Sequence, residues 1–485
     1  MSSKGQVYGT PQFRVLSQDE CKAIYSSSLE VLERTGVRIE HKGALSMLEE
    51  AGARVNDNVA HIPPHLVEET IRKAPKKILV YNREGKPCMR LEGTNYYFGT
   101  GSDCPNIIDS FTGEFRKFTT EDIGQAAVLA DALPNIDFIM SMGLISDKPM
   151  WVTDLYQFQQ MLFNSKKPIV FTCHDAQGNK DIIEMASIVA GGKQELSQRP
   201  FIIHYIEPSS PLRHSKEAVE KLLLCAQEKV PIIYTPCPSG GGTAPVTLAG
   251  NLVLALAEGL SGLVLSQLKR KGAPVIIGGV ITGMDMRTAT YCYGAPEFHL
   301  MSAALAGVCQ FLNIPMFGTA GCSDSKILDE QAAIEATLSI ALQALSGANL
   351  IHDVGYIGSG LIGSFDMLVM SNEIIAMAKR IMRGIPTQEE HLCVDLIDKV
   401  GPRGSYLAEG HTLNYFKKEH WRPDLMDRSD YQKWSREGSK SLGQRVNEKV
   451  KSILEKHKPE PMPEDKAEKI MKLIAREEKS RKVEY

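Results

Sequence analysis

The chain has 485 residues, of which 43% are hydrophobic and 23% are charged, as in an ordinary globular protein. Its net charge of -3 excludes the basic surface with which proteins bind nucleic acid or an anionic membrane. The N-terminal segment MSSKGQVYGTPQFRVLSQDECKAI has no apolar signal region, and no apolar stretch reaches the roughly 18 residues of a membrane span, so we expect a cytoplasmic protein. The ten cysteines are scattered singly, so we expect reduced thiols.

Residues 1–90 carry two helix patterns. SQDECKAIYSSSLEVLERTG ends in a glycine that is typical of a helix C-terminus. PPHLVEETIRKAPKK begins with prolines, which suit the first turn of a helix. We therefore predict a helical extension over residues 1–90.

Eight short apolar runs follow, and each is succeeded by small or polar residues and then by a helix pattern. Their starts are 31 to 43 residues apart, which is the room that a strand, a helix and two loops require. The runs begin at Tyr96, Asp137, Pro168, Pro200, Pro231, Pro274, Pro315 and Ala348. Continuous apolar runs are typical of parallel strands that are buried on both faces. The pattern predicts an α/β fold with a (β/α)8 TIM barrel over residues 91–380, and a doubly wound open sheet is the alternative.

Residues 381–485 become progressively more charged and predict a helical tail. The stretch EDKAEKIMKLIAREEKSRK is an amphipathic helix pattern of the kind found on solvated or subunit-contacting helices. We expect a homo-oligomer.

In a barrel of this kind, reactive groups lie in the loops after the strands. The glycine run in CPSGGGTAP lies in one of these loops, but it lacks the lysine and the spacing of a phosphate-binding loop. It is better explained as a pocket wall that a ligand approaches closely. Neither a G-x-S-x-G elbow nor another sign of Ser/His/Asp hydrolysis is present.

Cysteines and histidines also follow the strands, which leaves a zinc site open as an alternative. Those residues are Cys104, Cys173, Cys237, Cys322, His174, His204 and His352. Cysteine also fills barrel ends as a small apolar residue, so we predict no metal. The carboxylates there suit acid–base chemistry and loop capping equally, and they are Asp103, Asp175, Glu207, Asp285, Asp324 and Asp353. Tyrosines cluster near the same ends, and rings of this kind can cage a quaternary ammonium ion.

Several long segments in one order resemble the trimethylamine methyltransferase superfamily across nearly the whole chain. They include HIPPHLVEETIRKAPKKILVYNR, YYFGTGSDCPNIIDSFTGEFRKFTTEDI, GTAGCSDSKILDEQAAIEATLSIALQALSGANLIHDVGYIGSGLIGSFD and HTLNYFKKEHWRPDLMDRSDYQKW. The resemblance implies a barrel that demethylates methylated amines and passes the methyl group to Co(I) of a separate corrinoid (cobalamin) protein. Members that act on trimethylamine carry pyrrolysine, whereas this sequence has only the twenty standard residues, so the resemblance points to the non-pyrrolysine, quaternary amine branch.

From the strand-end positions and this resemblance we expect a quaternary amine:corrinoid protein methyltransferase with glycine betaine as the preferred donor. Proline betaine, carnitine or another betaine is an alternative donor, and a zinc-thiolate methyltransferase or hydrolase and a quaternary amine binding protein are alternatives of other classes. The expected catalytic residues are Asp103, Glu207 and His352. The expected substrate-binding residues are Tyr96, Tyr97, Ser102, Tyr205, Tyr234, Arg287 and Tyr356, and Gly240, Gly241, Gly242, Gly355 and Gly358 are expected to face the corrinoid.

Overall fold

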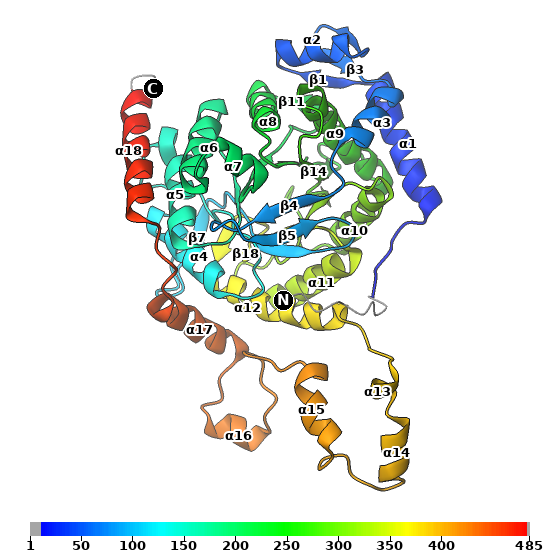
Figure 1. The fold of residues 1–485 in the computed structure, drawn as a ribbon, viewed down its shortest axis with the longest axis vertical. Helices are drawn as coiled ribbons and strands as arrows, with labels where there is room; N and C mark the ends of the chain where they lie inside the picture. Colours follow the sequence, from blue (N-terminus) through cyan, green and yellow to red (C-terminus); the bar gives the residue numbers. More distant parts are fainter. Residues whose placement is uncertain (1–10, 483–485) are drawn as a thin grey trace.

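A parallel sheet that curls round on itself forms the centre of the computed structural model, which describes residues 11–482 (Figure 1). Its strands, in the order in which they pair, are β6 (Tyr97–Thr100), β17 (Leu350–Val354), β16 (Met316–Thr319), β14 (Val275–Gly278), β12 (Ile232–Tyr234), β10 (Ile202–Ile206) and β9 (Ile169–Phe171). The remaining place, between β6 and β9, is taken by Phe138 and Ile139, which bridge to Gly99 and Ile169. The predicted TIM-barrel fold is confirmed, with the second strand reduced to these two bridges.

The strand order also excludes the open sheet, because neighbours in the sheet follow one another around the barrel in chain order. An outer helix follows each strand position. These helices are α4 (Thr120–Ala132), α5 (Thr153–Asn164), α6 (Ala176–Ala190), α8 (Lys216–Glu228), α9 (Leu248–Lys269), α10 (Pro296–Phe311), α11 (Glu330–Ser346) and α12 (Phe365–Met382). Polar N-caps begin several of them, as Asp175 does for α6 by accepting the Gly178 N–H at 2.8 Å.

Helix α9 is the one helix of the described chain that is long and apolar enough to cross a membrane. The sequence-based expectation that no stretch would reach that length was therefore wrong. Its most apolar 18-residue window is 78% buried inside the fold, and α9 packs against α1, α3, α8 and β14. It is a core helix of the barrel wall.

The N-terminal extension contains three helices, α1 (Gln18–Arg34), α2 (Lys42–Glu50) and α3 (Pro64–Lys73), of which α1 and α3 follow the predicted patterns. It also contains strands that the sequence did not suggest, namely β1 (Val37–Ile39), β2 (Arg54–Asn56), β3 (Val59–His61), β4 (Ile78–Tyr81) and β5 (Pro87–Leu91). Hairpin β4–β5 packs its apolar side chains against Phe138, Val170 and Ile203, and so it covers the amino end of the barrel. The extension is therefore mixed, because strands of three to five residues are too short to show a clear period.

Short elements in the loops after the strands surround the carboxyl end of the barrel. Strands β7 (Asn106–Ile108), β8 (Phe115–Lys117), β18 (Tyr356–Ile357) and β19 (Ile362–Ser364) form one small sheet. Strands β13 (Ser239–Gly240) and β15 (Thr282–Gly283) form another, and β11 (Arg213–His214) pairs with β1 of the extension. The remaining short elements are η1 (Met150–Val152) and α7 (Lys193–Gln198).

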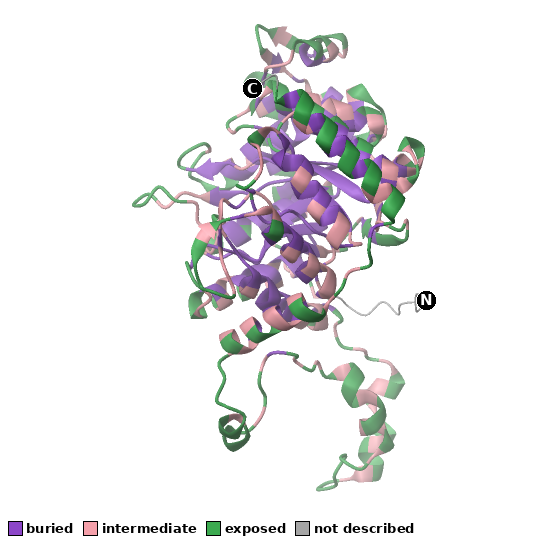
Figure 2. Cartoon of the chain, turned by 90° about the vertical axis from the view of Figure 1, so that its left-hand side faces the viewer, coloured by how far each residue is buried: buried purple, intermediate pink, exposed green. Residues whose placement is uncertain are grey.

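The helical tail divides into an arm and a returning part (Figures 1 and 2). The arm consists of α13 (Glu389–Leu392), α14 (Val394–Val400), α15 (Gly410–Glu419) and α16 (Tyr431–Arg436), and none of these helices has a buried residue. Helix α17 (Leu442–Lys456) then packs on α12 and α4, and α18 (Glu464–Arg481) packs on α6 and α5. The prediction about the signal peptide falls partly on residues 1–10, which lie outside the described residues.

Candidate active site at the carboxyl end of the barrel

The carboxyl ends of β10 and β12 bring three polar side chains into contact. Side chains alternate along a strand, so Tyr205 and Glu207 point inward from β10 and its extension, as Cys237 does after β12. The Tyr205 hydroxyl donates a hydrogen bond to Glu207, and the Cys237 thiol donates to Glu207 Oε1 at 2.9 Å. Tyr205 is buried, whereas Glu207 is exposed, so solvent reaches this carboxylate from the open end of the barrel.

A second carboxylate, Asp103, faces the same space from the loop after β6. Its backbone has a left-handed conformation with φ of 69°, and its Oδ1 accepts a hydrogen bond of 3.2 Å from the Thr172 hydroxyl of the β9 loop. Burial raises the pKa of Asp103, hydrogen bonds from Ser102 and Thr172 oppose that rise, and the charge of Glu207 adds to it. Two of the three predicted catalytic residues, Asp103 and Glu207, therefore interact electrostatically across the mouth of the barrel.

His352 and Asp353, at the end of β17, supply the remaining predicted catalytic residue and a third carboxylate. The His352 ring stacks on Phe317 at 4.2 Å, its Nε2 is hydrogen-bonded to the Thr319 hydroxyl at 2.9 Å, and its Nδ1 lies 2.8 Å from Asp353 Oδ1. Asp353 has a φ of 71°, and a Cβ added at Gly101 would lie 2.3 Å from its Oδ1. Gly101 thus leaves the room in which the Asp353 carboxylate sits.

Two tyrosines from the loop after β14 line the same mouth. The centroids of the Tyr291 and Tyr293 rings are 6.2 Å apart, and the Tyr291 hydroxyl donates to the Cys237 carbonyl. Burial raises the pKa of Tyr291, and negative charge on Cys237 and Glu207 adds to the rise. For Tyr293 burial is again the largest cause of a raised pKa, followed by the charge of Asp353. Aromatic faces and carboxylates therefore surround one space.

Four of the predicted substrate residues lie elsewhere. Tyr96 and Tyr97 are at the amino end of β6, where the Tyr97 hydroxyl accepts the Arg90 N–H at 3.0 Å against hairpin β4–β5. Tyr234 points outward from β12 and is hydrogen-bonded to His214 Nδ1 at 2.6 Å. Arg287 has 92% of its side chain exposed and pairs only loosely with Asp285, at 3.9 Å. Strand direction accounts for the position of Tyr96 and Tyr97 and side-chain alternation for that of Tyr234, whereas Arg287 lies in the loop after β14 with its side chain in solvent.

The other predicted residues divide between wall and rim. The Tyr356 hydroxyl donates to the Met142 carbonyl at 2.7 Å, and its ring occupies the space beside Gly101, so it is a wall of the mouth. Gly355 and Gly358 are buried, with positive φ, and fill turns between β17 and β19. Gly240 is also buried in β13, whereas Gly241 and Gly242 are exposed on the rim. Of the five glycines, only these last two can face a partner directly.

The residues of the zinc hypothesis are not arranged as a ligand set. Within residues 11–482, no group of three or more His, Cys, Asp or Glu side chains is placed to hold a metal ion. Cys173 and His204 Nε2 instead contact each other at 3.3 Å, and His204 Nδ1 contacts Cys225 at 3.3 Å behind the strands. Burial keeps the pKa of His204 well below its usual value, so this imidazole is a neutral core residue.

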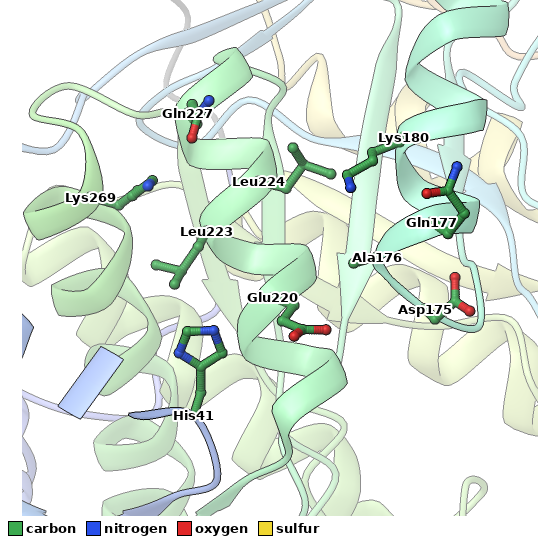
Figure 3. A pocket seen from close by; sticks show the side chains of 10 residues that line it. All are labelled: His41, Asp175, Ala176, Gln177, Lys180, Glu220, Leu223, Leu224, Gln227 and Lys269. Atoms are coloured by element: carbon green, nitrogen blue, oxygen red, sulfur yellow. The ribbon is translucent and has the colours of Figure 1, made fainter. Parts of the chain in front are cut away.

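A groove of about 580 Å³ lies away from the mouth, along helix α8 on the outside of the barrel (Figure 3). Its side chains come from helices α6, α8 and α9 and from His41 of the extension. Its charged side chains are Lys180, Lys269, Glu220 and Asp175, and Asp175 is already engaged as the cap of α6. The groove is therefore a mixed-charge surface feature, and the mouth is the better candidate for chemistry.

Comparison with known proteins identifies the family. The sequence profile described as trimethylamine methyltransferase (MTTB) matches residues 2–482. The chain belongs to the trimethylamine methyltransferase family. It is 35% identical over 460 residues to trimethylamine methyltransferase MttB of Desulfitobacterium hafniense (strain DSM 10664 / DCB-2), with 94% of this chain and 92% of that protein covered. It is 29% identical over 470 residues to the glycine betaine methyltransferase of Desulfitobacterium hafniense (strain Y51), covering 96% and 97%.

Among solved structures, the monomethylamine methyltransferase of Methanosarcina barkeri has the same fold at 13% identity, with a TM-score of 0.55 over 92% of this chain and 88% of that chain. The trimethylamine methyltransferase family membership makes this chain a methyltransferase with a TIM-barrel-like fold. The relatives act on different amines, so the donor has to be argued from the mouth.

Proposed function

We propose that this member of the family removes a methyl group from a small quaternary amine and passes it to Co(I) of a partner corrinoid protein. The observation that carries the proposal is the composition of the barrel mouth. Asp103, Glu207 and Asp353 converge there beside tyrosine rings, and the Glu207 carboxylate is open to solvent. Carboxylates and aromatic faces both attract a permanent cation.

The chemistry matches a site without a conventional acid–base triad. Reduced cobalt, bound in the partner, would supply the nucleophile that takes the methyl group. The N–CH3 bond breaks with its electron pair staying on nitrogen, so a quaternary donor leaves as a neutral tertiary amine and no proton has to be supplied. The residues of the mouth then have three tasks, which are to bind the cation, align one methyl group toward the opening and exclude water.

The rim of the mouth offers a surface on which a partner could approach. Apolar side chains of the loops after β12, β14, β16 and β17 are between 58% and 70% exposed, and they are Val246, Met286, Ile327 and Leu361. The exposed glycines Gly241 and Gly242 lie among them. This proposed surface for the corrinoid protein lies on the side of the mouth formed by the loops of these four neighbouring strands.

The resemblance favours glycine betaine as the donor, with proline betaine and carnitine as alternatives. The carboxylate of a betaine would require hydrogen-bond donors, and Ser102, the expected donor, is hydrogen-bonded to Asp103. Arg287, the expected cationic partner, is directed into solvent. A cytoplasmic location, where the ten free cysteines and the reduced cobalt would both persist, is part of the same proposal.

Incubation of the purified chain with Co(I) cobalamin and a panel of quaternary amines tests the proposal. We expect the absorbance of methyl-Co(III) to appear with at least one donor. Tyr205→Phe removes the hydroxyl that holds Glu207 and should lower the rate. Tyr97→Phe makes the same change at the amino end of the barrel and should leave the rate unaltered. Failure of every donor in the panel would contradict the proposed function.

A further inference from the structure

Among the residues that the structure describes, none of the three carboxylates of the mouth is paired with a Lys or Arg. Within residues 11–482, Asp103 and Glu207 form no ion pair. The imidazole of His352 lies beside Asp353, with its Nδ1 2.8 Å from Asp353 Oδ1. Some carboxylates outside the mouth do have such a partner, as Asp109 and Asp122 have Arg116 at 2.7 Å. The mouth therefore gathers three carboxylates without a Lys or Arg counterion, and the charge of His174 is the one that lowers the pKa of Asp103.

The charges of Glu207 and Asp353 act on neighbouring groups that line the space. After burial, the charge of Glu207 is the next cause of the raised pKa of Tyr205, and the charge of Asp353 is the next cause for Cys104 and Cys322. A cation that enters the mouth is stabilised by the same charges. A carboxylate that enters with it is repelled by them and loses its hydration without gaining a counterion.

A second observation concerns the floor of the mouth. Thr235 is fully buried, and its hydroxyl has no hydrogen-bond partner among the described residues. Ile233 belongs to the inner barrel cluster, so Thr235, two residues on, points to the same inner side. A Cβ added at Gly278 of the neighbouring strand would lie 2.7 Å from the Thr235 hydroxyl. An unpaired hydroxyl at this depth is suited to a neutral polar group of a ligand.

We propose that the mouth selects small quaternary ammonium ions with a neutral substituent, such as choline, over betaines. This inference rests on the proposed function and reverses the order of donors that the resemblance suggested. The balanced reaction converts choline and Co(I) into dimethylaminoethanol and methyl-Co(III), with the N–CH3 electron pair retained on nitrogen. Choline carries one positive charge and no carboxylate, and its hydroxyl matches the unpaired Thr235.

Two measurements on the full chain test the inference, namely initial rates with Co(I) cobalamin and calorimetric binding without cobalamin. Choline and glycine betaine are compared in both. We expect kcat/KM and affinity to favour choline over glycine betaine by at least about tenfold. This ratio corresponds to a difference of about 1.4 kcal/mol in free energy. Glu207→Gln should lower that preference by several-fold, mainly through weaker choline binding. Glu217→Gln, an exposed carboxylate on α8 outside the mouth, changes the net charge equally and should leave the preference intact.

The outcomes separate the two proposals. Methyl transfer that prefers glycine betaine would overturn the inference and leave the methyltransferase proposal standing. An equal response of the preference to Glu207→Gln and Glu217→Gln would also overturn it. Absence of transfer from every donor would overturn the proposed function, and the calorimetric order of choline and glycine betaine would still decide the inference.

Discussion

Gly101→Ala tests whether the wall of the mouth is as tightly fixed as its geometry indicates. A Cβ at this position would lie 2.3 Å from Asp353 Oδ1 and 2.3 Å from Cε2 of Tyr356. Ordinary contacts begin at 3.4 Å, so both groups would have to move by about 1 Å. The Tyr356 ring cannot move freely, because its hydroxyl is hydrogen-bonded to the Met142 carbonyl at 2.7 Å.

We expect Gly101→Ala to lower the free energy of unfolding by about 1–3 kcal/mol through overpacking. A displacement of about 1 Å in the site should reduce kcat/KM for methyl transfer by about 100-fold per folded molecule. Denaturant unfolding and methyl-Co(III) formation measure the two effects. Gly283→Ala is the matched control, because a Cβ there meets nothing within 4 Å. If Gly101→Ala retains the stability and kcat/KM of the Gly283→Ala control, the described packing of Asp353 and Tyr356 is wrong.

Three further predictions concern regions outside the mouth. Burial raises the pKa of Glu258 from 4.5 to about 7, so between these pH values the folded state holds a proton that the unfolded state releases. The free energy of unfolding should therefore fall by up to about 3 kcal/mol between pH 4.5 and 7. Glu258→Gln should flatten this pH dependence in unfolding measurements. Tyr234→Phe removes the hydroxyl bonded to His214 and should cost about 1–2 kcal/mol of stability, with kcat/KM per folded molecule unchanged; a selective loss of activity would restore Tyr234 as a substrate residue. Leu407 and Leu413 of the arm are 86% and 74% exposed, and we expect them to contact another subunit. The double variant Leu407→Ser, Leu413→Ser should therefore have the mass of a monomer in light scattering, where we expect the unaltered chain to have that of an oligomer. An unchanged mass would argue against the arm as the subunit contact.

The barrel was predictable because its signals are local. Each strand is a continuous apolar run that often begins with proline, and the spacing of Pro168, Pro200 and Pro231 is set by one helix and two loops. Hairpin β4–β5 was not predictable, because its apolar residues meet the amino end of the barrel only after the whole chain has folded. The reduction of the second strand to bridges at Phe138 and Ile139 likewise depends on its neighbours in the barrel.

The site was predictable only as a set of loops. Asp103 and Glu207 follow strands and His352 lies near the carboxyl end of β17, whereas Tyr97 is the first residue of β6 and lies at the opposite end of the barrel. Tyr234 is on the correct strand but has the wrong parity, since Ile233 takes the inward position. Alternation from a known inward residue could have made that distinction. No local pattern could have shown that the three carboxylates lack basic partners, because those contacts join strands far apart in the sequence.

Transfer of an isotopically labelled methyl group tests the central claim most directly. The full chain is mixed with Co(I) cobalamin and a donor whose methyl groups carry deuterium, and the products are analysed by mass spectrometry. The account predicts equal amounts of trideuteromethyl cobalamin and of the tertiary amine that remains when the donor has lost one methyl group. Unlabelled cobalamin together with intact donor, under conditions in which the chain is folded and binds the amine, would contradict it.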